Sequence, residues 1–336
     1  MTLSGVAGSI GGNDAASPGA AVREHWRKIA VAVAMAVATA GILAVDYYVI
    51  GLDALFIAVV LALTLWSLVE FYAMCEARGT SPFARFGVVS GVMLAALNWV
   101  ATPGTLAWFA PRLGIAGRTY ANLQRLLSED LVRFGLVVAV LGAIWFQATK
   151  RDNDRTFESI STTLFGILYV WFLSSFLTKL RHLGADGTLG GPDWNVVGSG
   201  LLFSGLLVTK LADIGGYLFG RRYGRHRMIP RISPRKSYEG LAAGLALSIA
   251  SGAVLQNIGC LPFASIWHGV LFGALVGGMG VLGDLAESLL KRGSGRKDAG
   301  THIPGFGGIL DVVDSILLSA PVAYFLSLIL LKQSVG

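Results

Sequence analysis

The sequence predicts an all-α, polytopic membrane protein with about nine transmembrane helices. Hydrophobic residues make up 54% of the 336 positions and charged residues only 14%, whereas soluble globular proteins carry about 25% charged residues. Apolar runs able to cross about 30 Å of hydrocarbon recur along the chain. No stretch suits a separate soluble domain, so the chain is expected to lie almost wholly in and at the membrane.

Nine apolar runs are the expected spans. The fourth is short and suits a tilted or partly re-entrant course, and the first two are close enough to form a helical hairpin. In chain order, the runs cover residues 29–45, 53–69, 87–109, 134–148, 160–178, 196–212, 240–259, 266–283 and 310–330.

The chain divides into three regions. Residues 1–25 are rich in Gly, Ala and Ser without a helical period, which is typical of a disordered tail. They do not resemble a secretory signal peptide, because no basic stretch leads directly into an apolar core with a cleavage site. Residues 26–185 are the N-terminal transmembrane helices, and 186–336 are a C-terminal transmembrane region that carries the polar motifs and is therefore the expected catalytic part.

Two basic segments set the orientation. Segment 221–236 carries seven Lys or Arg residues, and segment 291–297 carries four. Two expected spans separate them, so both face the same compartment, which is the cytoplasm by the positive-inside rule. The net charge of +7 thus needs no nucleic-acid partner. The loop 111–133, with four Arg, is expected on the opposite side and fits this rule less well.

Two acidic stripes lie where one span ends and the next begins. Asp284, Glu287 and Lys291 are spaced i, i+3 and i+7 and share a helix face, as do Asp311 and Asp314. A helix start favours the latter two by about 0.3–1 kcal/mol, but this dipole disfavours the former two acids. Carboxylates at this depth need a cation, a partner or water. Two such stripes suit Mg²⁺, which takes one or two carboxylates and keeps positions for water and phosphates.

Basic side chains beside these stripes suit substrate phosphates. Positive-inside topology alone is the competing explanation for each of them. They are Lys291, Arg292, Arg296 and Lys297.

The other basic segment adds a second group of polar residues. Asp213 ends the preceding span, and Ser233 and Lys236 suit a nucleoside triphosphate. Ser237 and Glu239 fit equally well an N-cap and a first-turn acid of the next helix.

These motifs resemble those of the phosphatidate cytidylyltransferases (CDP-diacylglycerol synthases). That family's pattern runs Ser, two residues, Lys-Arg, four residues, Lys-Asp, then Pro-Gly-His-Gly-Gly and Asp-Arg-x-Asp. The matching residues here are Ser288, Lys291-Arg292, Arg296-Lys297-Asp298, Pro304-Gly305-Phe306-Gly307-Gly308 and Asp311-Val312-Val313-Asp314. GDLAES, ISPRKSYEG and, more faintly, LVEFY at 68–72 are similar to family segments as well. The close match covers about 210–320.

The resemblance implies transfer of a cytidylyl group from CTP to phosphatidate, giving CDP-diacylglycerol and pyrophosphate for phospholipid biosynthesis. It implies Mg²⁺, leaves open a monovalent cation and a homodimer, and places the protein in the cell (inner) membrane. The lipid would keep its tails in the bilayer and meet CTP at a polar active site on the cytoplasmic face. The family motifs thereby account for charges at a membrane boundary.

The resemblance also implies the site residues. Asp284 and Asp311 would hold the metal, with Asp314 the next candidate. Asp213 would orient one of the Lys or Arg side chains that bind phosphates. The expected catalytic residues are Asp284, Asp311, Asp314 and Lys297, and the expected substrate-binding residues are Asp213, Ser233, Lys236, Glu239, Lys291, Arg292 and Asp298.

Two positions depart from the family pattern. Phe306 stands where the family has His, and Val312 where it has Arg. The attacking phosphate is already anionic at pH 7, so it needs no base. Metal and Lys or Arg can stabilise the leaving pyrophosphate. We expect both departures to leave the activity in place.

Four other functions compete with this one. A CTP-dependent prenol kinase, or a cytidylyltransferase acting on another lipid phosphate, would use the same kind of site. A CDP-alcohol phosphotransferase is disfavoured because that family's Asp-Gly-x-x-Ala-Arg string is missing. A transporter would place charges near the bilayer midplane and show an internal repeat, whereas here the charges cluster at span ends.

Overall fold

A computed structural model of the chain describes residues 34, 37–42, 44–45, 53–102, 109–126, 130–150, 154–184, 194–296, 298–300 and 307–335. Among these residues, seven helical segments are long and apolar enough to cross a membrane. They are α2 (Ala54–Ala77), α6 (Leu131–Ala148), the continuous run of α7 (Thr156–Gly166), the π-helical turn η4 (Ile167–Phe172) and α8 (Leu173–Arg181), then α9 (Trp194–Tyr223), α10 (Tyr238–Asn257), α11 (Ile266–Gly293) and α12 (Leu310–Val335). A shorter apolar helix is α3 (Ala84–Val100).

Each predicted span from 53–69 onward overlaps one of these helices, which confirms a helical, polytopic membrane protein. The predicted span 87–109 overlaps α3 only as far as Val100, and this helix is shorter than the seven. The fourth predicted span is the single helix α6. The first, 29–45, and the tail 1–25 lie largely or wholly outside the described residues, so the count of nine stays a prediction. The division at residue 185 also stays a prediction.

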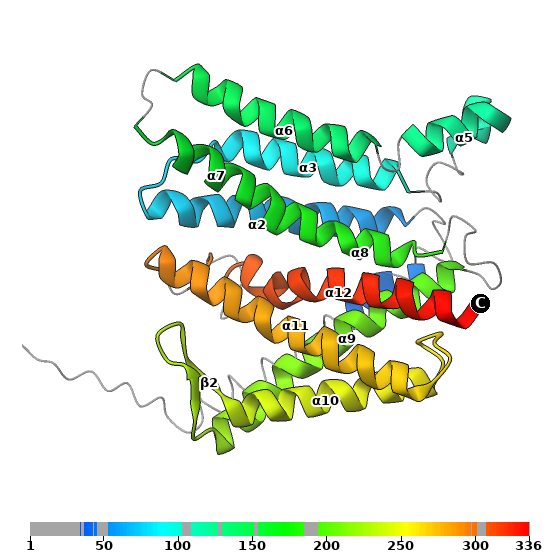
Figure 1. Cartoon of the computed structure of the whole chain (residues 1–336), viewed down its shortest axis with the longest axis vertical. Coiled ribbons are helices and arrows are strands. Elements are labelled where there is room, and N and C mark those ends of the chain that lie inside the picture. The colour runs from blue at the N-terminus through cyan, green and yellow to red at the C-terminus, as the bar shows by residue number, and fades with distance from the viewer. Residues whose placement is uncertain are drawn as a thin grey trace, which may run out of the picture.

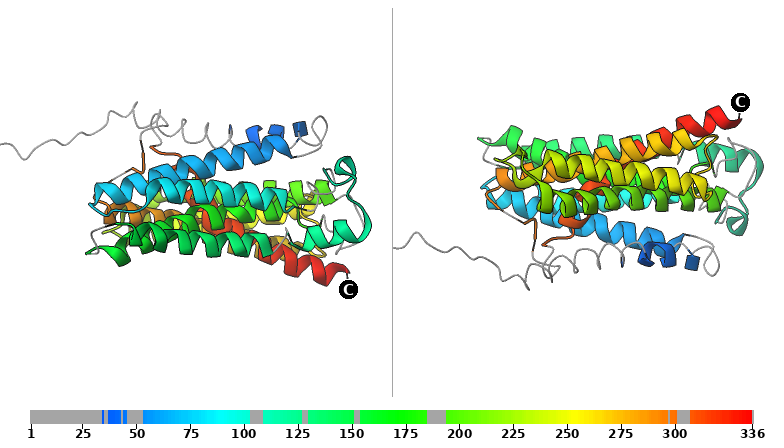
Figure 2. Two further views of the ribbon diagram at one scale, coloured as in Figure 1. Left: turned by 90° about the horizontal axis from the view of Figure 1, so that it is seen from above. Right: turned by 90° about the horizontal axis from the view of Figure 1, so that it is seen from below.

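The helices run side by side in two stacked groups (Figures 1 and 2). In Figure 1 the upper group holds α2, α3, α6 and α7–α8, and the lower group holds α9 to α12. The final helix, α12, joins the groups because it packs against α2 and α8 as well as α11 and α9.

Small residues let the helices around α11 approach closely, as is common in membranes. A Cβ added at Gly283 of α11 would come within 2.6 Å of the Asp314 carbonyl oxygen on α12. A Cβ at Gly244 of α10 would come within 2.5 Å of the Ala212 carbonyl oxygen on α9. These backbone contacts bring the polar positions of α9, α11 and α12 together.

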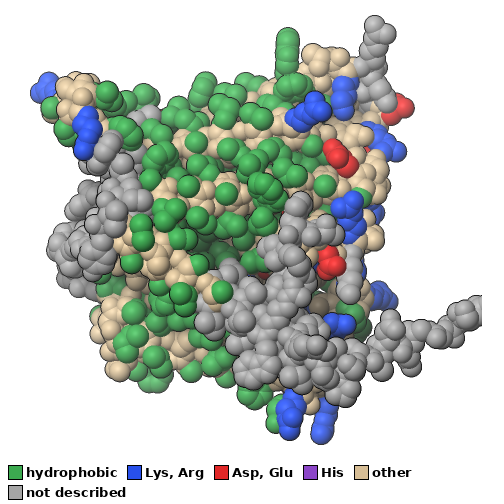
Figure 3. Space-filling view, turned by 180° about the vertical axis from the view of Figure 1, so that it is seen from behind, with side chains coloured by type: hydrophobic (Ala, Val, Ile, Leu, Met, Phe, Trp, Pro, Cys, Tyr) green, Lys and Arg blue, Asp and Glu red, His purple; other side chains and the backbone are tan. Residues whose placement is uncertain are grey.

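Both basic segments lie at the same end of the bundle, as predicted. Arg292 Nε at the end of α11 donates to the Ile232 carbonyl oxygen of the other segment at 3.2 Å. In the space-filling view, Lys, Arg, Asp and Glu side chains gather at this end while hydrophobic side chains cover the middle (Figure 3). The short helix α5 (Gly117–Arg125) of the loop 111–133 lies at the opposite end (Figure 1).

One feature differs from the all-helical prediction. Segment 221–236 contains an antiparallel hairpin of β1 (Arg227–Ile229) and β2 (Ser233–Ser237). Its turn closes through a hydrogen bond of 3.1 Å from the Ile232 N–H to the Ile229 carbonyl oxygen, and Pro230 occupies the turn position where its fixed φ is favoured. The prediction missed it because abundant charge masked the alternation of so short a hairpin.

Candidate active site

Five carboxylates converge at the hairpin end of the bundle. Asp213 comes from α9, Asp284 and Glu287 from α11, and Asp311 and Asp314 from α12. Asp314 interacts electrostatically with Asp284 and Asp213, and Glu287 interacts with Asp311 and Asp314. The two acidic stripes of the sequence therefore form one cluster, which Asp213 joins.

Asp311 is oriented by the chain around it. Its Oδ2 accepts hydrogen bonds from the Ala299 N–H at 3.0 Å and the Gly308 N–H at 2.6 Å. Its Oδ1 lies 2.6 Å from Lys291 Nζ, which also pairs with the fully buried Glu287. One oxygen is thus fixed by backbone donors, while the other pairs with a lysine that Asp311 shares with Glu287.

Asp284 connects α11 to the hairpin. Lys236 Nζ on β2 lies 2.8 Å from Asp284 Oδ2, and Ser288 Oγ lies 3.4 Å from Oδ1. The Asp284 side chain keeps about a third of its surface exposed, so a ligand can still reach it.

Asp213 belongs to a network that the sequence analysis did not identify. Ser315 Oγ donates to Asp213 Oδ2 at 2.9 Å and accepts from Lys210 Nζ at 2.9 Å. The same ammonium donates to the Val312 carbonyl oxygen at 2.8 Å and lies 3.6 Å from Asp213 Oδ2. The signal was a lysine inside an apolar span, three residues before Asp213.

A cavity of about 500 Å³ opens beside the cluster, between the hairpin and α9, α10 and α11. Its size suits a small-molecule ligand. Four of the predicted site residues line it: Asp213, Ser233, Lys236 and Asp284. The hairpin and α9 add three arginines that were not assigned individually: Arg221, Arg227 and Arg235.

Two predicted substrate-binding residues contact the protein's own backbone instead. Glu239 accepts from the backbone N–H groups of Arg225 at 3.1 Å and His226 at 3.2 Å, and from His226 Nδ1 at 2.6 Å. Arg292 binds the hairpin at Ile232. Ser237 accepts from the Gly240 N–H at 3.2 Å as the N-cap of α10, so the capping alternative for it is confirmed. For Glu239 and Arg292, ligand binding stays a prediction.

Part of the predicted motif lies outside the described residues. This holds for Lys297 and for the segment 301–306, which contains Phe306. Asp298 is described and exposed, and it lies next to Gly307, whose φ of 99° requires glycine at that turn. Asp298 thus stands at the edge of the Asp311 turn.

Glu70 on α2 is a buried residue of this region that the site prediction missed. Its carboxylate accepts from the Ile309 N–H at 3.0 Å and the Leu310 N–H at 2.8 Å. These are the first amide groups of α12, which have no partner within the helix. Glu70 therefore fixes the start of the helix that carries Asp311. The signal was one acid within the apolar run LWSLVEFY.

The donor set fits a divalent cation with few protein ligands. Within the described residues, no three His, Cys, Asp or Glu side chains surround a single point. Instead the ammonium groups of Lys236 and Lys291 lie against Asp284 and Asp311. These positive groups mark where a cation is favoured, and Mg²⁺ needs only one or two carboxylates.

Comparison with known proteins identifies a matching family and several similar proteins. The model of the cytidylyltransferase family matches residues 28–330, which include every candidate site residue. A phosphatidate cytidylyltransferase of Synechocystis sp. is 33% identical over 279 residues, covering 78% of this chain and 84% of that protein. One from Thermotoga maritima is 32% identical over 216 residues, covering 63% and 75%. One from Bacillus subtilis is 32% identical over 174 residues, covering 52% and 60%.

Proposed function

Because the chain belongs to the cytidylyltransferase family, we propose that it transfers the cytidylyl group of CTP to phosphatidate, giving CDP-diacylglycerol and pyrophosphate. The observation that carries this proposal is the cavity in which a basic hairpin faces an acidic cluster at one end of a membrane helix bundle. A nucleotide can enter it from water, and a lipid headgroup can reach it from the bilayer.

The hairpin supplies the cations for the triphosphate. Ser233, Lys236 and Arg227 line one wall of the cavity, and Arg221 of α9 lines another. Arginine forks and lysine ammonium groups both suit phosphate oxygens. Once CTP is bound, Lys236 would turn from Asp284 to the phosphates and free that carboxylate.

The reaction needs little covalent chemistry from the protein. An oxygen of the phosphatidate phosphate, which carries a charge of about −1.5 to −2 at pH 7, attacks the α-phosphorus of CTP in line. The bond from that phosphorus to the α,β-bridging oxygen breaks, and pyrophosphate leaves with the electron pair. Catalysis is then positioning and charge neutralisation, which Lys291 and Lys297 would provide.

Asp284 and Asp311 would hold Mg²⁺, with Asp314 beside them. The ion would neutralise charge on the nucleotide phosphates. The protein's part is to orient the two carboxylates, and the backbone N–H groups of Ala299 and Gly308 do this for Asp311.

The orientation in the membrane is part of the proposal. The hairpin end carries most of the Lys and Arg residues of the described loops, so the positive-inside rule places it in the cytoplasm. In a bacterial cell this corresponds to the inner membrane. Labelling an introduced cysteine at the exposed Arg231 from one side of sealed vesicles would test this.

Acceptor choice separates the proposal from its alternatives. Purified protein in detergent would be given CTP labelled at the α-phosphate, Mg²⁺ and either phosphatidate, a polyprenol or a polyprenyl phosphate. We expect labelled CDP-diacylglycerol and one pyrophosphate per turnover with phosphatidate alone. CDP released with a phosphorylated polyprenol would establish a kinase instead. A labelled polyprenyl product would establish another lipid acceptor.

A further inference from the structure

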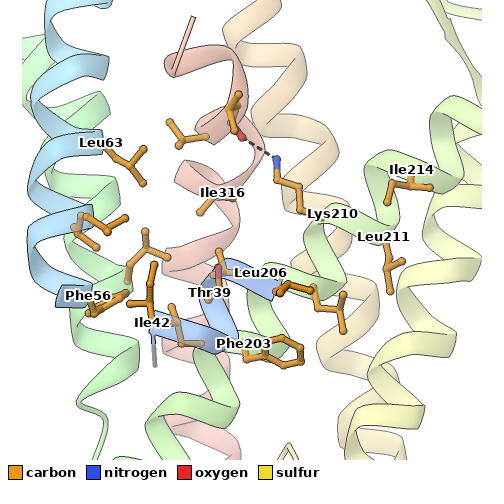
Figure 4. A pocket seen from close by; sticks show the side chains of 18 residues that line it. Thr39, Ile42, Phe56, Leu63, Phe203, Leu206, Lys210, Leu211, Ile214 and Ile316 are labelled. Carbon is orange, nitrogen blue, oxygen red and sulfur yellow. Dashed lines mark hydrogen bonds between the residues drawn. The ribbon is translucent and has the colours of Figure 1, made fainter. Parts of the chain in front are cut away.

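A second cavity, of about 270 Å³, is lined by α9 residues between Leu202 and Ile214, whereas the nucleotide cavity is lined by α9 residues between Ala212 and Arg221. Of the described residues that line it, all are apolar except Thr39 and Lys210. They come from the segment 37–42 and from α2, α8, α9 and α12, and all but the first segment belong to the candidate membrane spans. Figure 4 shows Phe56, Phe203 and Leu206 around this space.

The contribution of α9 to this cavity is one continuous face. Phe203, Leu206, Leu207, Lys210 and Ile214 line it at i, i+3, i+4, i+7 and i+11, the spacing of one side of a helix. A lysine therefore interrupts an apolar face at membrane depth. An apolar cavity of this kind excludes water and takes apolar ligands, so a hydrocarbon chain is the occupant that its surface suits.

Lys210 connects this cavity to the acidic cluster. Its stem lines the cavity, and its ammonium turns to the Val312 carbonyl oxygen and Ser315 Oγ, at 2.8 and 2.9 Å (Figure 4 shows the former contact). The same ammonium attracts the carboxylates of Asp213 and Asp314 electrostatically. It thus stands between an apolar compartment and the proposed metal site.

We propose that one acyl chain of the lipid substrate occupies this cavity and that Lys210 binds the lipid's phosphate. The inference rests on the proposed function. A phosphatidic acid has the required shape, since its tails and its phosphate lie at opposite ends of a short glycerol unit. With a chain beside Leu206 and the phosphate at Lys210, the nucleophilic oxygen faces the Asp213–Asp314 side, where the cytidylyl group is to be attacked.

The two parts contribute differently to binding. A tail that leaves the bilayer for this cavity passes from one hydrocarbon environment to another, so burial adds little affinity. The cavity acts through shape: it selects the chain and fixes the position of the phosphate. The charge-assisted contact of Lys210 supplies the affinity.

Kinetics with each substrate varied separately test this assignment. We expect Lys210→Met to raise the KM for dioleoyl phosphatidate by about 10–100-fold and to leave the KM for CTP within about twofold, with Lys210→Arg restoring part of the loss. A purely structural lysine would raise both KM values together or lower kcat alone. Either of these results, or an unchanged KM for phosphatidate, would overturn the role of Lys210.

A cavity-filling variant tests the acyl site without touching a charge. Leu206→Trp is expected to lower kcat/KM for dioleoyl phosphatidate about tenfold more than for dihexanoyl phosphatidate, because the short chain needs less of the cavity. Val254→Trp on the exposed apolar face of α10 is the matched control and should not change this ratio. An unchanged ratio in the folded Leu206→Trp variant would place the tail elsewhere.

Binding separates this inference from the proposed reaction. The thermal midpoint of the protein in detergent would be measured with dioleoyl phosphatidate and no CTP. A ligand that binds the folded state raises this midpoint, and we expect a shift in the wild type that Lys210→Met and Leu206→Trp reduce. That result without turnover would reject the proposed reaction and keep the lipid site. Equal shifts in all three proteins would reject the site.

Discussion

At the end of the bundle opposite the hairpin, Asp53 accepts from Arg181 at 2.5 Å and from His182 Nε2 at 2.9 Å. The other nitrogen of His182 lies 2.8 Å from the Thr178 carbonyl oxygen, and all three side chains are largely buried. At the hairpin end, by contrast, Lys236 pairs with Asp284 at the wall of a large cavity, and both remain partly exposed.

The two clusters differ in whether a ligand from outside the protein can contact their charged side chains. Both oxygens of Asp53 are engaged by side chains inside the protein, Arg181 and His182, so this group joins the start of α2 to the end of α8. Asp284 contacts a lysine on the cavity wall that a substrate phosphate can draw away. Asp311 lies deeper in the same cluster and shares the buried Lys291 with Glu287. A closed charge cluster thus stabilises the fold, whereas an open one can exchange partners and do chemistry.

Removing the charge of Asp53 should produce the largest loss of stability. Asp53→Asn keeps a residue that tolerates the left-handed φ of 51° but leaves Arg181 and His182 without a carboxylate. Breaking a buried pair costs about 3–5 kcal/mol, which would appear as a lower midpoint of thermal unfolding in detergent. Turnover per folded molecule should stay near that of the wild type.

The matched control is Asp130→Asn, which breaks an ion pair with Arg133 whose side chains are mostly exposed. Such pairs contribute about 0–1 kcal/mol, so its midpoint should hardly move. Equal shifts in the two variants would contradict a special role for the Asp53 cluster.

Acid should remove the same stabilisation in the wild type. Burial alone would raise the pKa of Asp53, but the His182 hydrogen bond and the Arg181 charge outweigh it and hold the pKa below its ordinary value. The folded pKa is then below that of the unfolded chain, about 3.9. The stabilisation is complete above that value and is lost as pH falls through the folded pKa. The midpoint difference between wild type and Asp53→Asn should therefore narrow only below about pH 4.

At the open cluster, a lysine substitution should change substrate binding rather than stability. Lys236→Met removes a cation from the nucleotide cavity, and hydrogen bonds to charged groups are worth about 1.5–3 kcal/mol, or about 10–100-fold in KM for CTP. Arg231→Met removes a charge from the exposed hairpin turn, away from the cavity lining, and serves as control. The same rise in KM for both variants would mean that only the net charge of the hairpin matters.

Glu70 combines features of both clusters. It is buried like Asp53, but it holds the start of α12, the helix that carries Asp311. Glu70→Ala removes the cap of α12 and should cost about 0.5–2 kcal/mol of stability. We also expect a several-fold fall in kcat, because the turn before Asp311 loses its anchor. Glu70→Gln, which can still accept one N–H, should recover part of both. A stability loss with unchanged kcat would show that the cap does not position Asp311.

The smallest effect is expected at Phe306. Phe306→His restores the residue typical of the family, yet the attacking phosphate needs no base, so kcat/KM should change less than about tenfold. Steady-state rates with phosphatidate would show this. A larger gain would reveal a proton transfer that the proposed mechanism lacks.

Much of the fold could be predicted from the sequence, because long apolar runs identify transmembrane helices. The runs from 53–69 to 310–330 each overlap a helix, although α3 ends at Val100, before the predicted end of its run at residue 109. The acidic stripes could also be predicted, since the spacing of Asp284 to Lys291 and of Asp311 to Asp314 places each set on one face of its helix. Helix ends were less certain: α2 extends to Ala77, beyond the predicted end at residue 69, because its last turns contain Glu70 and Glu76 and read as less apolar.

Contacts between distant segments could not be read in the same way. Glu70 caps a helix that begins 240 residues later, and only tertiary packing brings the two together. Lys210 reads as an isolated charge until Ser315 of α12 is placed beside it. The hydrogen bonds of Glu239 to the backbone of Arg225 and His226 could not be predicted either, because they depend on a β-hairpin that the sequence analysis did not predict.

The central claim is that the chemistry belongs to the open cluster alone, and Asp311→Asn tests it most directly. Its Oδ2 contacts are to backbone N–H groups, which the Asn side-chain oxygen can still accept. The buried Lys291 loses one partner but keeps its ion pair with Glu287, so the protein should still fold, with a lower thermal midpoint. Formation of labelled CDP-diacylglycerol from α-labelled CTP and phosphatidate would be measured beside the thermal midpoint, with Asp53→Asn in parallel. We predict a fall in kcat of at least about 10²–10³-fold in the folded Asp311→Asn protein, whereas Asp53→Asn should lower the midpoint and leave turnover per folded molecule near that of the wild type. A folded Asp311→Asn protein with near-normal turnover would contradict the account.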